Sequence, residues 1–105
     1  QVKRKFLQEI YRVYPKAEYY HFGDIDCGGF RIWKNLCVKT EIPFKTIYMD
    51  LEVYNKYLKW GRPLTEQDRK NLRNMMEDSF FANQRELFQN ILDKGIKLEQ
   101  ECIEL

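Results

Sequence analysis

The sequence predicts an α/β domain in which helices flank a parallel sheet. Two aromatic-rich, strand-like segments, 17–22 and 44–50, are separated by a segment with helical periodicity, and an acidic residue stands at or just beyond the end of each. A strand, a helix and a second strand in this order form the right-handed crossover unit of a parallel sheet. Ligands of open α/β sheets bind at the carboxyl ends of the strands. We therefore expect the acidic residues to share one edge of the sheet.

Helical segments surround the two predicted strands. Apolar residues spaced three to four apart predict a helix over 2–14, which Pro15 ends. The same spacing predicts a helix over 30–37, directly after two glycines. Asp50 precedes a helical segment over 51–60, so we expect it to cap that helix, with a place near a metal site as the alternative.

The C-terminal part of the sequence is expected to be helical. Thr65 and Asp68 resemble a capping box that opens a helix through Met76. A further helix over 87–92 is expected to stop with Gly95 as its C′ residue. We interpret the methionines and phenylalanines of this region as core residues rather than as a cofactor site.

The segment from Asp24 to Gly29 carries the strongest functional signal. Alternate residues of a strand point to the same face, so Asp24 and Asp26 can direct their oxygens at one Mg²⁺. Gly28 and Gly29 allow a tight turn and the close approach of a ligand. The alternative is an acidic turn that caps the next helix, which is the commoner role of an isolated Asp-x-Asp.

Composition limits the classes of protein to consider. A chain of 105 residues forms one domain, residues 1–105, and because it begins at Gln1 we expect a fragment of a longer protein. Hydrophobic residues make up 44% and charged residues 32%, as in a folded domain. Since no apolar run reaches the roughly 18 residues of a membrane span, we expect no membrane association and a cytoplasmic protein.

The cysteines and the charges give weaker signals. Three cysteines, without a Cys-x-x-Cys pair and with a single histidine, favour neither disulfides nor a zinc site. The net charge of +2 says little about partners. Positive charge nevertheless lies on both sides of the acidic pair, which would suit a phosphate backbone, although most such runs are solvated helix faces. The residues concerned are Lys3, Arg4, Lys5, Arg31, Lys34 and Lys39.

Several segments together form a more specific pattern. They are Phe22-Gly23-Asp24-Ile25-Asp26 with Gly29-Phe30-Arg31-Ile32, Tyr48-Met49-Asp50, Leu64-Thr65, and Gly95-Ile96 with Leu98-Glu99-Gln100-Glu101. From residue 20 onward this pattern resembles the C-terminal Toprim-type domain of the nuclease subunit of Wadjet-like, SMC-associated plasmid-defence systems. The glycine and acid motif alone is also similar to the A subunit of type IIB topoisomerases. The closing Leu-Glu-Gln-Glu element favours the defence nucleases.

The resemblance implies a Toprim-like, Rossmann-like sheet, present as a partial domain with a helical C-terminal part. It also implies an endonuclease that uses Mg²⁺ or Mn²⁺. Asp24 and Asp26 would hold the metal, and a catalytic glutamate would lie before Gln1. Gly28, Gly29 and Arg31 would contact the substrate, with Arg31 on a backbone phosphate. Glu99 and Glu101 match terminal acids of the family, so either one of them contacts the metal or both are solvent-facing charges.

The implied partners are double-stranded DNA and SMC-like complex subunits, and a homodimer is left open. We favour hydrolysis over a topoisomerase-like strand transfer, because Tyr19, Tyr20 and Tyr48 are expected to be buried strand aromatics rather than nucleophiles. Two other classes remain as alternatives. One is a phosphotransferase, for which the sequence offers no clear strand to carry the required lysine, and the other is a non-catalytic module that binds DNA or partner subunits.

Overall fold

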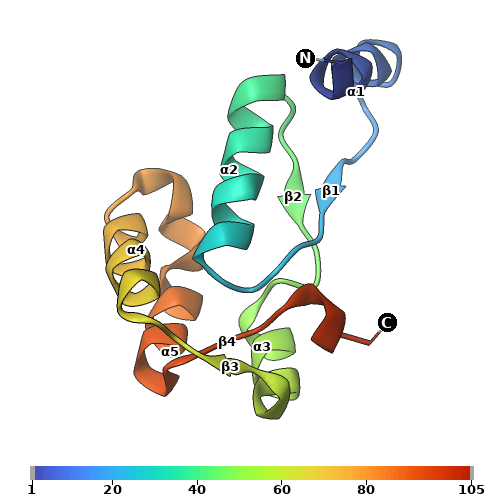
Figure 1. Cartoon of the computed structure of the whole chain (residues 1–105). Helices are drawn as coiled ribbons and strands as arrows, with labels where there is room; N and C mark the ends of the chain where they lie inside the picture. The colour runs from blue at the N-terminus through green and yellow to red at the C-terminus, as the bar shows by residue number, and fades with distance from the viewer. Residues whose placement is uncertain (1, 105) are drawn as a thin grey trace.

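The computed structural model describes residues 2–104, and most of them lie in helices (Figure 1). The elements in chain order are α1 (Val2–Val13), β1 (Tyr20–His21), α2 (Cys27–Thr40), β2 (Lys45–Thr46), α3 (Leu51–Tyr57), the 3₁₀ turn η1 (Leu58–Trp60), β3 (Arg62–Pro63), α4 (Glu66–Met76), η2 (Ser79–Gln84), α5 (Arg85–Lys94), β4 (Ile96–Lys97) and η3 (Gln100–Cys102).

The predicted parallel sheet flanked by helices is wrong. β1 and β2 do pair in parallel across α2, but only over two residues each, with Tyr20 opposite Lys45 and His21 opposite Thr46. β3 and β4 form a separate antiparallel pair, and no third strand joins either pair within residues 2–104. β2 cannot extend far because Tyr48 has a left-handed backbone (φ 57°), which interrupts the extended conformation. The Rossmann-like fold implied by the resemblance is therefore corrected to a mostly helical domain.

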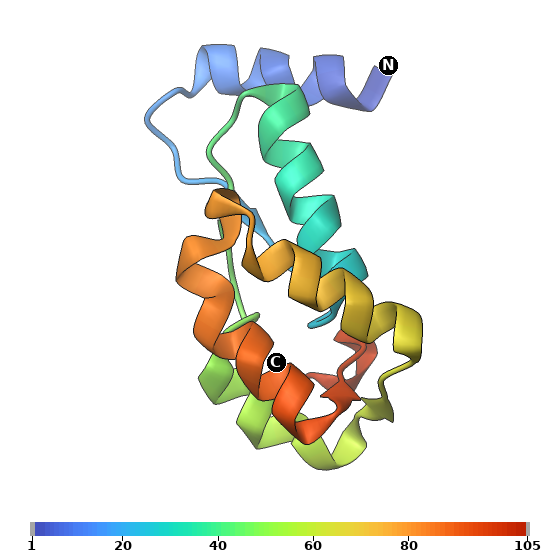
Figure 2. The same cartoon turned by 90° about the vertical axis from the view of Figure 1, so that its left-hand side faces the viewer.

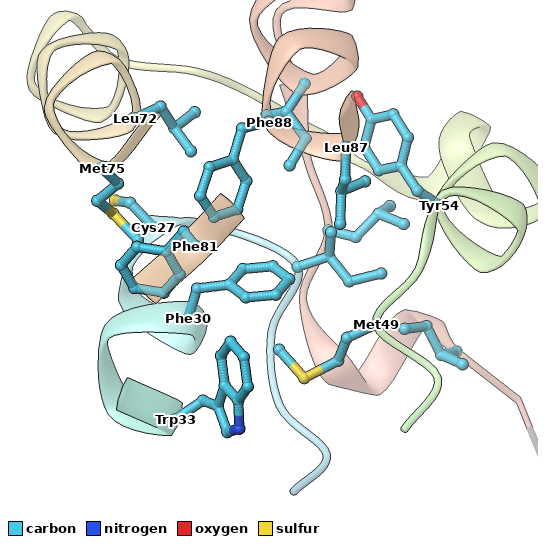
Figure 3. Close-up of a cluster of buried hydrophobic side chains, with 14 of the residues drawn as sticks. Cys27, Phe30, Trp33, Met49, Tyr54, Leu72, Met75, Phe81, Leu87 and Phe88 are labelled. Atoms are coloured by element: carbon cyan, nitrogen blue, oxygen red, sulfur yellow. The ribbon is translucent and has the colours of Figure 1, made fainter. Parts of the chain in front are cut away.

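The apolar residues that would have covered a sheet instead pack between helices (Figure 3). The ring of Phe30 on α2 lies 5.0 Å from that of Phe88 on α5, and Phe88 lies 5.6 Å from Phe81 on η2. Trp33 adds a further ring to this cluster, and its indole Nε1 donates to the carbonyl oxygen of Phe44 at 2.8 Å. The cluster is thus both apolar and free of an unsatisfied indole donor.

Helix α1 crosses one end of α2, away from the rest of the core (Figures 1 and 2). Leu7 and Tyr11 pack against the core, but no described residue of α1 is fully buried. Val2 is 84% exposed and Phe6 64%. The rest of the domain therefore covers only part of the apolar face of α1.

Local helix signals were predicted more successfully than the sheet. The reciprocal capping box of Thr65 and Asp68 opens α4, and Asp50 caps α3 by accepting from the N–H of Val53. Gly95 ends α5 in the left-handed conformation (φ 67°), as expected. The segment predicted as one helix over 51–60 is divided into α3 and η1.

Replacing Phe88 with Ala is expected to lower the free energy of unfolding by about 3–5 kcal/mol, because its fully buried ring leaves a cavity. Phe6→Ala is the matched control and should change it by less than about 0.5 kcal/mol, since that side chain is mostly exposed. Urea unfolding followed by circular dichroism measures both values. Equal losses in the two variants would contradict this description of the core.

Candidate functional site

Asp24 and Asp26 lie on either side of the fully buried Ile25. Ile25 pairs with Leu98 in an isolated antiparallel bridge, with N···O distances of 2.9 and 3.2 Å in the two directions. Because side chains alternate along extended backbone, burying Ile25 directs both carboxylates to the opposite side. We call the segment from Asp24 to Asp26 the acidic corner.

Asp26 caps helix α2. Its Oδ1 accepts a hydrogen bond from the backbone N–H of Gly29 at 2.7 Å, so the helix-cap interpretation of this residue is confirmed. Burial raises the pKa of Asp26 above its usual value, the Gly29 N–H opposes that rise, and the neighbouring charge of Asp24 adds to it. The ionised form of this carboxylate is therefore disfavoured, and a nearby cation would stabilise it.

Asp24 binds the C-terminal segment of the chain. Its Oδ1 accepts from the backbone N–H of Gln100 at 2.6 Å, across 76 positions of sequence. The neighbouring acids face elsewhere or stay in solvent: Glu99 forms an exposed ion pair with Arg62, with 3.2 Å between Oε1 and Nε, and Glu101 is exposed. The structure thus brings this segment to the corner through its backbone, and the predicted roles of Glu99 and Glu101 stay predictions.

Lys97 and Asp68 form a second charged pair beside the corner, although the sequence pattern predicted no role for Lys97 and only a helix cap for Asp68. The Nζ of Lys97 lies 2.7 Å from Oδ2 of Asp68, and both side chains are mostly buried. The positive charge of Lys97 also offsets part of the rise in the pKa of Asp26. Lys97 lies 29 positions from Asp68, and its neighbour Leu98 meets Ile25 only in the folded structure, so no local sequence signal could have suggested it.

Oxygen donors suited to a hard cation are present at the acidic corner. Asp24 and Asp26 each use Oδ1 in a hydrogen bond to a backbone N–H, and each carboxylate has a second oxygen. Among residues 2–104, no three His, Cys, Asp or Glu side chains gather in a group that could hold a metal ion. Two carboxylates nonetheless fit Mg²⁺, which commonly takes one or two of them and fills its other positions with water or phosphate.

The two glycines of the corner differ in what surrounds them. A Cβ on Gly29 would collide with the backbone carbonyl of Asp24, whereas one on Gly28 would make only ordinary contact with Oδ1 of Asp26, at 3.4 Å. Gly29 is therefore needed for the close packing of α2 on the corner. Arg31 is exposed one turn further along α2, and the predicted substrate contacts of these three residues stay predictions.

Cys27 is buried, whereas two of the three tyrosines weighed as nucleophiles are exposed. Cys27 is a buried free thiol whose pKa is raised by burial, and its Sγ lies 3.8 Å from Oδ1 of Asp68. Tyr20 and Tyr48 are 46% and 43% exposed, so the expectation that they are buried is wrong, whereas Tyr19 is partly buried.

None of the helices between residues 2 and 104 is long and apolar enough to cross a membrane.

The fold and the acidic corner define a small, mostly helical domain with a carboxylate pair at the start of a helix. The family described as "Wadjet protein JetD, C-terminal" matches residues 3–105, and the chain belongs to this family. It is 29% identical to the Wadjet protein JetD of Bacillus cereus (strain Q1) over 84 aligned residues. The aligned region covers 80% of this chain and 20% of that relative. The chain therefore spans about a fifth of the length of this curated relative. No solved structure matches it.

Gly29→Ala is expected to destabilise the fold by about 3 kcal/mol, because the added methyl group meets backbone rather than a movable side chain. Gly28→Ala is the matched control. It should leave stability unchanged or raise it by up to about 1 kcal/mol, since the position is helical and open. Thermal unfolding of the two variants tests this, and a stable Gly29→Ala protein would show that the contact is wrong.

The ion pair of Lys97 and Asp68 is expected to stabilise the fold by about 1–2 kcal/mol at neutral pH. Burial opposes ionisation of Asp68, but hydrogen bonds from Lys97 and Thr65 outweigh it, so the pKa of Asp68 lies below its usual value. This contribution is therefore complete above the unfolded-state pKa, near 3.9, and is lost as pH falls through the folded-state pKa.

The matching measurement is urea unfolding of the wild-type protein and of Lys97→Met at several pH values. The difference in unfolding free energy should be present at pH 7 and should shrink below about pH 4 as Asp68 takes up a proton. A difference that stays constant down to the lowest pH at which both proteins fold would argue against the ion pair as its source.

Proposed function

We propose that this chain is part of a metal-dependent DNA endonuclease of a Wadjet plasmid-defence system, and that it cleaves phosphodiester bonds of foreign or plasmid DNA. The observation that carries the proposal is that burial of Ile25 directs the carboxylates of Asp24 and Asp26 to the same side. Membership of the JetD C-terminal family supports it. SMC-like complex subunits are the partners that we propose for the full-length protein.

Asp24 and Asp26 would hold Mg²⁺ or Mn²⁺. The bound ion would supply positive charge to the phosphate as negative charge develops during hydrolysis. Lys97 would remain on Asp68 at the edge of the corner and offset part of the acidic charge before the metal binds. We propose that a glutamate elsewhere in the full-length protein completes the site, consistent with the much greater length of the curated relative.

Two substitutions test the metal site in the full-length protein. Asp24→Asn and Asp26→Asn should each reduce Mg²⁺-dependent cleavage of supercoiled plasmid by more than about 100-fold, because a neutral amide is a poor ligand for a hard cation. Both variants keep an oxygen that can accept from the backbone N–H, so the caps should persist. Agarose gels of time courses with Mg²⁺, Mn²⁺ and a chelator measure the effect.

Asp93→Asn is the control, because Asp93 is an exposed acid on α5 whose contact with Gln89 an amide can keep. It should cleave at the wild-type rate. The melting temperature of Asp26→Asn should be equal to or above that of the wild-type protein, since the substitution removes a charge that burial disfavours. Wild-type cleavage by either corner variant would refute the metal site.

A non-catalytic module that binds DNA or partner subunits is the second candidate. It is favoured by one observation, namely that the described residues do not gather three metal-binding side chains. The two candidates differ in one result. If the full-length wild-type protein binds plasmid DNA but does not cleave it with Mg²⁺ or Mn²⁺, the second candidate is correct.

A further inference from the structure

Charge is unevenly divided along the chain. Residues 2–40 contain eight Lys or Arg and four Asp or Glu, a net charge of +4, whereas the remaining residues carry a net charge of −2. The first part includes α1, the acidic corner and α2. The basic excess therefore lies on α2, which begins at the corner, and on α1, which packs against the other end of α2 (Figure 1).

The exposed face of α2 contains no acidic side chain. Arg31, Asn35 and Lys39 are spaced four residues apart, so they lie along one face of the helix. The opposite face is buried through Phe30 and Trp33. Because Asp26 caps the same helix, this cationic face begins about one turn from the acidic corner.

A groove between α1 and α2 continues this face. It has a volume of about 260 Å³, and cationic and apolar side chains line it without any acid: Lys3, Arg4, Lys39, Leu7, Ile32 and Leu36. Asn35 borders both this groove and a neighbouring hollow that is lined by Arg31, Lys34 and Asp78. Lys34 forms an ion pair with Asp78 in that hollow, so Arg31 is the cation that extends the positive surface beyond the groove. We call this surface, from Arg31 along α2 to Lys3 and Arg4 on α1, the basic track.

The length of the basic track suits a nucleic-acid strand. Arg31 and Lys39 are eight residues apart on α2, which is about 12 Å along a helix. Phosphates of one B-DNA strand advance about 3.4 Å along the duplex axis per nucleotide, so a duplex lying parallel to α2 would place about three or four nucleotides of one strand along this distance. The apolar floor of the groove is compatible with this, because long basic side chains lay their methylene groups on apolar surface and keep their charges in solvent.

We propose that the basic track binds the phosphate backbone of the DNA that leads to Asp24 and Asp26. This inference rests on the proposed function and adds the path that the substrate takes. An acidic protein segment could also be attracted to the groove. DNA is favoured because the cations extend beyond the groove along α2 toward the acidic corner, at helical spacing and with a hydrogen-bonding Asn35 between them.

The test compares two double variants of the full-length protein in a chelator, where no cleavage occurs. Lys3→Glu with Lys39→Glu reverses two exposed charges of the track. Lys59→Glu with Lys70→Glu is the matched control, because both side chains are exposed and Lys59 lies in η1, at the far end of the molecule from α1 (Figure 2). Fluorescence anisotropy of a labelled DNA duplex over a range of salt concentrations gives the affinity and its salt dependence.

The affinity of the track variant for DNA should be at least roughly tenfold lower than that of the wild-type protein. The slope of log affinity against log salt should be smaller in magnitude by about 2, because two phosphate contacts are lost. The control should keep both the wild-type affinity and the wild-type slope. If the track variant also keeps them, the proposal is overturned and the groove becomes a candidate site for an acidic protein segment.

The binding assay separates this proposal from the cleavage hypothesis. Repeating it with Asp26→Asn should give an affinity equal to or tighter than that of the wild-type protein in the chelator, because the substitution removes a negative charge and no contact of the track. Weaker binding of the track variant supports the track even if the corner variants cleave normally and the metal site is refuted. Equal binding by the track and control variants refutes the track even if cleavage depends on Asp26.

Discussion

The candidate site depends on one short contact, the antiparallel bridge between Ile25 and Leu98. It joins the start of α2 to a segment more than 70 residues later, and it buries both side chains completely. Burial of Ile25 fixes the direction of the two flanking carboxylates, and the bond from the Gln100 N–H to Asp24 holds the same segment on the other side. Lys97 is also held by the pairing of β4 with β3 and by Asp68, and the bridge continues this segment past the Asp-x-Asp to Gln100.

Structural and proposed catalytic roles coincide at the acidic corner. Asp26 caps a helix, which favours its ionised form, but it does so partly buried and next to a second carboxylate, which raises its pKa. Evolution for stability alone could retain the cap and discard the repulsion by using Asn or Ser at this position. A pair of charged groups held together at a cost to stability is more typical of a binding site than of a cap.

Local features of the fold could be predicted from the sequence, and the sheet could not. The capping box of Thr65 and the left-handed Gly95 depend on residues within one turn of each other, so the sequence pattern contains their cause. Strand length depends on distant partners and on single backbone angles, such as the positive φ of Tyr48 that interrupts β2. The ion pair of Lys97 with Asp68 spans 29 positions and leaves no periodic signal, which is why sequence reasoning missed it.

Helix α2 connects the two functional proposals physically. Its buried face fixes its position through Phe30 and Trp33, its first turn needs Gly29 to approach Asp24, and its exposed face carries the cations of the basic track. A rigid helix can set the spacing between a metal site and backbone contacts better than a loop, because packing fixes both of its ends. The carboxylates of the acidic corner would repel phosphate until a cation binds, whereas the proposed basic track would attract it at once. DNA would therefore bind first along α2, and the metal would then make the corner accessible to the phosphate to be cleaved.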